Sequence, residues 1–364
     1  NAPETLNGHT IFVRSGVYPA VVKPGITKSI SLIGESRYST IITGIVVDVT
    51  TNNVVISGFT IFNGCIELFG DGCTISNNIV AYSGGITLRN STNNTISNNI
   101  IVANDYNIYL SESTNNTISQ NYIGGVEGIR LSYYGIEIYR SSNNTIIRNN
   151  ITQCERAIRL EGVMPLGELQ SDASNNTIIE NNIQHFGFNG WGIALSQASN
   201  NRIVGNKITT LITPRPEGRG IWPDSPGIHL YRSFNNSIVQ NTVEWNDEGI
   251  FLTDSYLNSI IQNNATNNFY GLLLSGWGAL NLISQNKITQ NYHGILLQAY
   301  YSRQSNQLRY NNMTGNRYNF GVEGYSGLCD QDVDETNTVN GKPVYYWVNR
   351  QNDQIPSDAG YVAI

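Results

Sequence analysis

One nine-residue motif recurs along this chain and constrains its fold more than any other feature. It reads NNTISNNII from Asn93, and close copies begin at Asn115, Asn143 and Asn175. Weaker copies extend the series, which is anchored on the first core aliphatic residue of each copy: Ile56, Ile75, Ile96, Ile118, Ile146, Ile178, Ile203, Ile238, Ile260, Ile283 and Leu308. The anchors are 19 to 35 residues apart. Self-similarity at such a period predicts stacked repeats, not the separate domains that 364 residues would suggest.

Each repeat also contains a second short run of alternating apolar residues, about ten residues after the first. These runs are GITL at Gly85, NIYL at Asn107, GIEI at Gly135, AIRL at Ala157, GIAL at Gly192, GIHL at Gly227, GIFL at Gly249, GLLL at Gly271 and GILL at Gly294. No window has a sustained apolar period of 3.6 residues, so we expect very little helix. A period near 22 residues with three short strands predicts an all-β chain, a single-stranded parallel β-helix of about eleven or more coils.

Asparagine has a structural role in this interpretation. The chain contains 50 Asn, more than its 21 Lys and Arg plus 27 Asp and Glu together. Asn is favoured at turns and in the left-handed αL conformation. In each NN corner one Asn is expected to stack its amide on the equivalent Asn of the next coil, as in the amide ladders of stacked strands.

The repeats resemble the right-handed parallel β-helix proteins with PbH1 repeats, specifically the NosD-like group. The opening TIFVRSGVYPAVVKPGITKSISLIGESRYSTIITG is similar to the first coils of pectin-lyase-like solenoids, and NTVNGKPVYYWVN followed by DAGYVAI resembles a segment of NosD-like secreted proteins. The resemblance implies right-handed coils over residues 1–328 and a C-terminal segment, 329–364, that folds back on the solenoid or continues it. It also implies copper, although four His, two Met and four Cys show no clustered ligand spacing.

Charge and hydropathy exclude several classes of function. The net charge of −6 and the absence of a basic run argue against a nucleic-acid-binding surface. No apolar stretch is long enough to span a membrane. A chain that begins at Asn1 is typical of a processed or partial sequence. The resemblance to NosD-like secreted proteins implies an extracellular or cell-surface location.

N-glycosylation is expected at the exposed corners. The motif N-x-S/T occurs at Asn90, Asn93, Asn115, Asn143, Asn150, Asn175, Asn235, Asn264 and Asn312. Several of these are the first Asn of an NNT or NNS corner, which leaves the second Asn for the ladder. An NNT repeat also generates such motifs automatically, so the motif alone does not establish modification.

Catalysis is the less favoured interpretation. Glycosidases need two carboxylates about 5–9 Å apart. The expected outward row of the GIxL strands is Glu67, Thr87, Tyr109, Glu137, Arg159, Ala194, His229, Phe251, Leu273 and Leu296, with no acids on neighbouring coils. Asp247 and Glu248 could form a pair, but they occupy a turn position that is aromatic in the next coils. We therefore expect a non-catalytic structural or adhesive protein, a surface-layer or filament component, with a polysaccharide lyase or glycoside hydrolase as the alternative.

Two insertions and an aromatic series are candidate ligand or partner contacts. The insertions fall near 161–172 and 213–226, and long loops on a rigid scaffold often carry binding sites. The candidate residues are Arg215, Arg219, Trp222, Asp224 and His229, together with Phe234, Tyr256, Trp277 and Tyr300, which the spacing predicts to stack on successive coils. A Pro-stiffened loop and internal packing are the alternatives. The expected partners are glycans or other surface proteins, with end-to-end self-association through the solenoid ends.

Metal and disulfide expectations are limited. Asp330, Asp332 and Asp334 have the spacing of a calcium loop, but Glu335 stands where such a loop has glycine, so a solvated turn is preferred over calcium. No other cofactor is expected. Cys65 and Cys73 lie on neighbouring strands of the predicted coils, which makes a disulfide between them plausible in an oxidising compartment.

Overall fold

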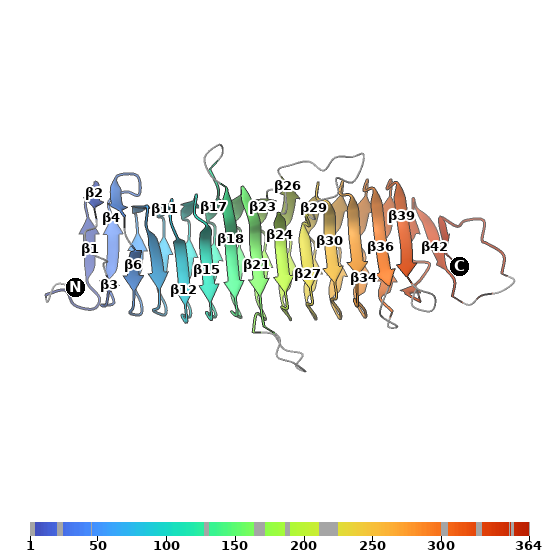
Figure 1. Cartoon of the computed structure of the whole chain (residues 1–364), viewed down its shortest axis with the longest axis horizontal. Coiled ribbons are helices and arrows are strands. Elements are labelled where there is room, and N and C mark those ends of the chain that lie inside the picture. The colour runs from blue at the N-terminus through green and yellow to red at the C-terminus, as the bar shows by residue number, and fades with distance from the viewer. Residues whose placement is uncertain are drawn as a thin grey trace. The chain divides into compact units, whose positions relative to one another are not determined.

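The repeat motif folds into short parallel strands in a computed structural model of the chain (Figure 1). The structure describes residues 4–19, 25–44, 46–126, 131–163, 172–185, 190–210, 225–299, 305–324, 330–348, 350 and 353–363. No helix occurs in these residues, which confirms the predicted all-β parallel solenoid. The chain forms two compact units, residues 1–184 and 185–364, and each coil contributes one strand to each of three sheets, A, B and C.

The first unit contains the following strands. Sheet A has β1 (Thr10–Val13), β4 (Ser31–Gly34), β7 (Val55–Ser57), β10 (Thr74–Ser76), β13 (Thr95–Ser97), β16 (Thr117–Ser119), β19 (Thr145–Ile147) and β22 (Thr177–Ile179). Sheet B has β2 (Gly16–Pro19), β5 (Thr40–Thr43), β8 (Thr60–Phe62), β11 (Ile79–Ala81), β14 (Ile100–Val102), β17 (Tyr122–Gly124), β20 (Asn150–Thr152) and β23 (Asn182–His185), which reaches the unit boundary. Sheet C has β3 (Gly25–Ile26), β6 (Val46–Val49), β9 (Cys65–Leu68), β12 (Gly85–Arg89), β15 (Tyr106–Ser111), β18 (Ser132–Tyr139) and β21 (Cys154–Glu161).

The second unit repeats this plan. Sheet A has β25 (Arg202–Val204), β28 (Ser237–Val239), β31 (Ser259–Ile261), β34 (Leu282–Ser284), β37 (Gln307–Arg309) and β40 (Asp332–Val333). Sheet B has β26 (Lys207–Thr210), β29 (Thr242–Glu244), β32 (Asn264–Thr266), β35 (Lys287–Thr289), β38 (Asn312–Thr314), β41 (Thr338–Val339), β42 (Lys342–Tyr346) and β43 (Tyr361–Ala363). Sheet C has β24 (Trp191–Ser196), β27 (Ile228–Tyr231), β30 (Glu248–Thr253), β33 (Tyr270–Ser275), β36 (His293–Ala299) and β39 (Tyr318–Gly324).

The register of sheet A agrees with the sequence anchors. Ile96 pairs with Ile75 on one side and with Ile118 on the other, and all three are fully buried. The same alignment holds in the second unit, where Ile260 lies between Ile238 and Ile283. One inward-facing aliphatic residue per strand therefore builds the core, because side chains of a β-strand alternate between its two faces.

The C-terminal segment first continues the coils and then reverses. β40 and β41 pair in parallel with β37 and β38. β42 is antiparallel to β41, and β43 then pairs in parallel with β42. The hairpin turns at Asn340 and Gly341, which both have positive φ.

Each corner between sheets A and B contains two adjacent residues, one exposed and one buried. The first residue, such as Gln120, has a left-handed backbone (φ 55°) and an exposed side chain. The second, such as Asn121, is buried, and its Oδ1 accepts from both the backbone N–H and the Nδ2 of Asn99 in the preceding coil. Its own Nδ2 donates to the carbonyl of Ile96 at 2.9 Å. The side-chain amide of Asn121 thus provides hydrogen-bond partners for main-chain groups that cannot pair within the sheets at the corner.

We predict that Asn121→Ala lowers the free energy of unfolding by about 2–4 kcal/mol, because it leaves buried donors of Asn99 and the buried carbonyl of Ile96 without partners. Urea denaturation followed by circular dichroism measures the change. Gln120→Gly is the matched control: it alters the neighbouring exposed residue, and glycine tolerates its positive φ. Equal losses in the two variants would contradict a stabilising role of the ladder.

Candidate functional site

The outer face of sheet C carries the most varied polar side chains of the repeat. Strand register places Glu67, Thr87, Tyr109, Glu137 and Arg159 in one row of the first unit, and Ala194, His229, Phe251, Leu273 and Leu296 in one row of the second. These are the alignments that the sequence predicts within each unit. A second outward row, three residues earlier on each strand, aligns Tyr106, Tyr134 and Arg156.

A cluster of charged groups surrounds the phenol of Tyr134. Its oxygen accepts from Nη1 of Arg156 at 2.6 Å and from Nη1 of Arg159 at 3.2 Å. Arg159 also forms ion pairs of 2.8 Å with both Glu137 and Glu161, which lie on neighbouring coils. One guanidinium therefore holds two carboxylates and a phenol together. We refer to these five residues as the tyrosine–arginine cluster.

Aromatic rings flank this cluster. Tyr106 stacks on Tyr134 with ring centroids 4.8 Å apart, and Tyr133 meets Tyr134 edge to face at 4.6 Å. The guanidinium of Arg156 lies 4.9 Å from the centre of the Tyr133 ring. Tyr106 is 41% exposed, and its ring also lies 5.7 Å from the Tyr109 ring, centroid to centroid.

Burial controls the electrostatics of the cluster. Desolvation raises the pKa of Glu137 above its usual range, although the charge of Arg159 opposes this shift. Desolvation likewise raises the pKa of Tyr134, so its phenol is protonated at neutral pH. Both side chains are almost fully buried. The cluster is therefore a preorganised set of hydrogen-bonding groups, with Tyr106 and Tyr133 as its exposed rings.

Most of this site is not predicted from the sequence. In the single predicted outward row, Glu137 is adjacent only to Tyr109 and Arg159. The second acid, Glu161, lies two residues beyond Arg159 on the same strand and is therefore diagonal to Glu137. Comparing all outward rows of adjacent coils would have found the pair, because diagonal neighbours are within reach of long side chains.

His229 is described, but its predicted partners are not. Arg215, Arg219, Trp222 and Asp224 lie outside the described residues. The His229 ring stacks on Phe251 at 4.7 Å, and the edge of Trp191 is 6.0 Å away. Desolvation lowers the pKa of His229 to about 4, so the imidazole is neutral at physiological pH.

The predicted aromatic series is correct only in part. Phe234 and Tyr256 stack with centroids 5.4 Å apart. Trp277 does not continue the stack, because the next coil has one additional residue at this corner and Ala279 occupies the equivalent position. Trp277 is instead 63% exposed. Tyr300 lies outside the described residues.

The candidate glycosylation sites lie on the surface of the coils. Asn90, Asn93, Asn115, Asn143, Asn150, Asn175, Asn235 and Asn312 are exposed, and Asn264 is half-buried. In the NNT corners the first Asn has positive φ, as at Asn115 (φ 56°), while the second, Asn116, is buried in the ladder. The two positions of each NN pair are thus physically distinct.

Cys65 and Cys73 are both buried thiols, and no disulfide joins them. Cys65 begins strand β9, near Gly84. Cys73 lies beyond the other end of that strand, where its sulfur accepts from the backbone N–H of Val54. The predicted disulfide is therefore wrong, because the length of β9 separates the two sulfurs.

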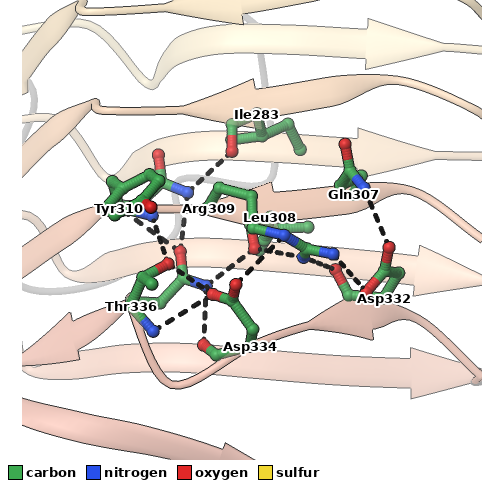
Figure 2. A network of polar contacts seen from close by, with 10 residues as sticks. Ile283, Gln307, Leu308, Arg309, Tyr310, Asp332, Asp334 and Thr336 are labelled. Atoms are coloured by element: carbon green, nitrogen blue, oxygen red, sulfur yellow. Dashed lines mark hydrogen bonds and ion pairs between the residues drawn. The ribbon is translucent and has the colours of Figure 1, made fainter.

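The aspartates proposed for calcium are already engaged by an arginine (Figure 2). Nη2 of Arg309 donates to Oδ1 of Asp332 at 2.6 Å, and its Nε lies 3.1 Å from Oδ2 of Asp334. The Thr336 hydroxyl donates to the other oxygen of Asp334. Asp330 is exposed. This network joins β37 to the last coil of sheet A.

The described residues do not fit a copper site. They contain no group of three or more His, Cys, Asp or Glu side chains that could hold a metal ion. Three histidines are engaged otherwise: His185 with Oδ1 of Asn246 at 2.8 Å, His229 with Phe251, and His293 stacked on Tyr270.

Two family comparisons bear on identity. The profile described as "Right handed beta helix region" matches residues 134–288, and that described as "Periplasmic copper-binding protein (NosD)" matches residues 7–163. Each model covers less than half of the chain, so these matches show what the chain is similar to over those residues. No curated protein sequence matched it. Among the described residues there is no helix long and apolar enough to cross a membrane.

Solved structures share the fold. The mannuronan C-5 epimerase AlgE6 A-module of Azotobacter vinelandii is 12% identical, with a TM-score of 0.64 over 91% of both chains. DFA-IIIase from Arthrobacter chlorophenolicus A6 is 13% identical, with a TM-score of 0.60 over 75% of this chain and 83% of its own. The periplasmic alginate epimerase AlgG is 14% identical, with a TM-score of 0.53 over 87% and 85%. At these identities the likeness establishes the fold alone.

We predict that Arg309→Ala lowers the thermal unfolding midpoint at pH 7, because Arg309 bonds to Asp332 and Asp334. The hydrogen bond from Arg309 lowers the pKa of Asp332 below its usual 3.8. A lowered folded-state pKa stabilises the protein at higher pH, and this stabilisation is lost as pH falls below about 4. The wild-type midpoint should therefore fall more steeply with acidification than that of the variant. Scanning calorimetry from pH 7 to pH 3 measures both slopes.

Arg350→Ala is the control, since Arg350 pairs with Asp353 at 3.8 Å on the surface. Calcium chloride should leave the wild-type midpoint unchanged. A rise in the midpoint with calcium would show that the carboxylates prefer the cation to Arg309.

Proposed function

We propose that this protein is an extracytoplasmic β-helix that binds a polysaccharide chain on the outer face of sheet C in its first unit. The observation that carries the proposal is the tyrosine–arginine cluster beside the exposed ring of Tyr106. Its natural partners are then glycans of a cell surface or matrix, and the role is adhesive or structural.

The chemistry of the cluster suits a sugar ring. Carbohydrates present C–H faces that pack on aromatic rings and hydroxyls that hydrogen-bond to planar charged groups. Tyr106 and Tyr133 offer exposed rings, and Arg156 lies beside Tyr133. Arginine and carboxylate groups held by one another are preorganised, which reduces the entropy lost on binding.

The structural neighbours support a carbohydrate ligand, although not a particular one. By their names, two of them are epimerases of mannuronan or alginate. The NosD family is described as periplasmic, as is AlgG, which supports a location outside the cytoplasm. The copper in the family description finds no fitting group among the described residues.

Catalysis on a polysaccharide is the second candidate, and the Glu137 and Glu161 pair favours it. Glycoside hydrolysis uses two carboxylates, one of them with a raised pKa as the general acid. Burial raises the pKa of Glu137 in this sense. Both carboxylates, however, are ion-paired to Arg159, and Tyr134 is buried. Binding therefore fits the geometry better than proton transfer.

We predict that Tyr106→Ala weakens polysaccharide binding about tenfold, which corresponds to ~1.4 kcal/mol. Affinity electrophoresis of the purified chain in gels containing neutral and uronic-acid polysaccharides identifies the ligand and ranks the variants. Tyr122→Ala is the matched control, because Tyr122 lies on sheet B with the same exposure of 41%. Equal loss in both variants, or no binding to any polysaccharide, would refute the proposed site.

The same polysaccharides distinguish binding from cleavage. A binding protein produces no new reducing ends and no unsaturated uronates on prolonged incubation. If the wild-type chain releases either product and Glu137→Gln abolishes the release, the enzymatic alternative replaces the proposed function.

We also propose that the outer Asn row carries glycans when the protein is made in a host that N-glycosylates. Asn93, Asn115, Asn143 and Asn175 occupy the same exposed corner position in successive coils of the first unit. We predict that enzymatic deglycosylation lowers the intact mass by several glycans, and that the fourfold Asn→Gln variant loses that shift in proportion. An unchanged mass after deglycosylation would exclude modification.

A further inference from the structure

The positive charge of Arg159 is already neutralised within the tyrosine–arginine cluster. Its guanidinium forms ion pairs of 2.8 Å with both Glu137 and Glu161, so one cation holds two carboxylates. This arrangement fixes the phenol of Tyr134, but it gives no preference for an acidic sugar over a neutral one. A preference for charge on this face has to come from another residue.

Arg89 lies on the same outer face and is joined to the cluster through tyrosine rings. It ends strand β12, two residues after the outward-facing Thr87, so its side chain leaves the same face of the sheet. Its guanidinium carbon is 5.7 Å from the centre of the Tyr109 ring. The Tyr109 ring is in turn 5.7 Å from that of Tyr106, which stacks on Tyr134. Tyr109 is therefore the shared neighbour of Arg89 and of the exposed ring of Tyr106.

The charge of Arg89 is not used within the protein. Another arginine at this edge of sheet C, Arg140, pairs with Glu112 at 3.3 Å and with Asp172 at 2.7 Å. Arg89 is exposed, and in the part of the chain that the structure describes no carboxylate or carbonyl accepts a hydrogen bond from it. Its neighbour in register on the next coil is the uncharged Ser111. The planar fork of N–H donors is thus available to a carboxylate from outside the chain.

We propose that Arg89 makes the polysaccharide site selective for acidic chains. Its guanidinium pairs with the carboxylate of a uronic acid unit, while Tyr106 packs against a sugar ring of the same chain. This inference rests on the proposed function and names the class of polysaccharide. The net charge of −6 repels polyanions in general, so an acidic chain needs a local cation to bind. Arg89 supplies that cation beside the exposed ring.

The test compares a uronan with its own methyl ester, which removes the charge and keeps the sugar backbone. Isothermal titration calorimetry with alginate and polygalacturonate should show that the wild-type chain binds one of them about tenfold more tightly than its ester. Arg89→Gln should lower the affinity for the acidic chain about tenfold and leave that for the ester within about twofold, whereas Tyr106→Ala should weaken both. Arg89→Lys keeps the charge without the planar fork, so it should retain only part of the preference.

Arg202→Gln is the matched control, because Arg202 is also exposed but lies on sheet A of the second unit. If the wild-type chain binds ester and acid equally, or if the two glutamine variants lose equal affinity, Arg89 does not select the ligand. Loss of binding in Tyr106→Ala would then still support the proposed function. If no polysaccharide binds, or if Tyr106→Ala binds as the wild type does, the site and its selectivity are both refuted. A lower thermal midpoint of Arg89→Gln would assign Arg89 a structural role instead.

Discussion

The buried asparagine ladder is the interaction on which the remainder of this structure depends. A coil that turns three times cannot pair its corner main-chain groups within the sheets, and a buried unpaired amide or carbonyl destabilises the fold by about 1–3 kcal/mol. Asn121 meets this requirement by accepting from Asn99 and donating to Ile96. In the second unit Asn263 likewise accepts from Asn241 and donates to Ile238. The ladder therefore determines corner geometry, and corner geometry determines which residues face outward.

Rows of buried aliphatic side chains and the asparagine ladders stabilise the interior of the coils. The residues on the outer faces can therefore differ from coil to coil without loss of the fold. The stacked coils therefore fix the spacing of surface groups, because equivalent side chains lie about 4.8 Å apart on adjacent strands. Stacked rings such as Tyr270 and His293 cover each other's faces and so stabilise the stack without exposing a binding surface. Tyr106 differs, because its ring stacks on Tyr134 and is still 41% exposed.

The sequence predicted regular features well and irregular ones poorly, for a physical reason. The pairing of Ile96 with Ile118 follows from the repeat period of the sequence. The outward position of Glu137 follows from the alternation of side chains along a strand. Trp277 was misplaced because a one-residue insertion shifts everything beyond it, and only the hydrogen-bond register reveals where the insertion lies. The Glu137–Arg159–Glu161 bridge was missed because it runs diagonally across rows. Such contacts depend on rotamers of long side chains, which a pattern of residue types does not specify.

In a repeat protein the regular coils show which residue each position normally holds. A coil with a different residue at that position is therefore informative. At a corner where seven coils have asparagine, a leucine with the same positive φ is disfavoured both by its backbone and by its exposure. Leu257 and Leu280 lie on adjacent coils, because the backbone N–H of Leu257 donates to the carbonyl of Ala279, and Trp277 precedes Leu280 at the same corner. Departures that cluster in space while each weakens local stability are those that folding does not explain. In this chain they lie on the surface, at positions that the ladder leaves free.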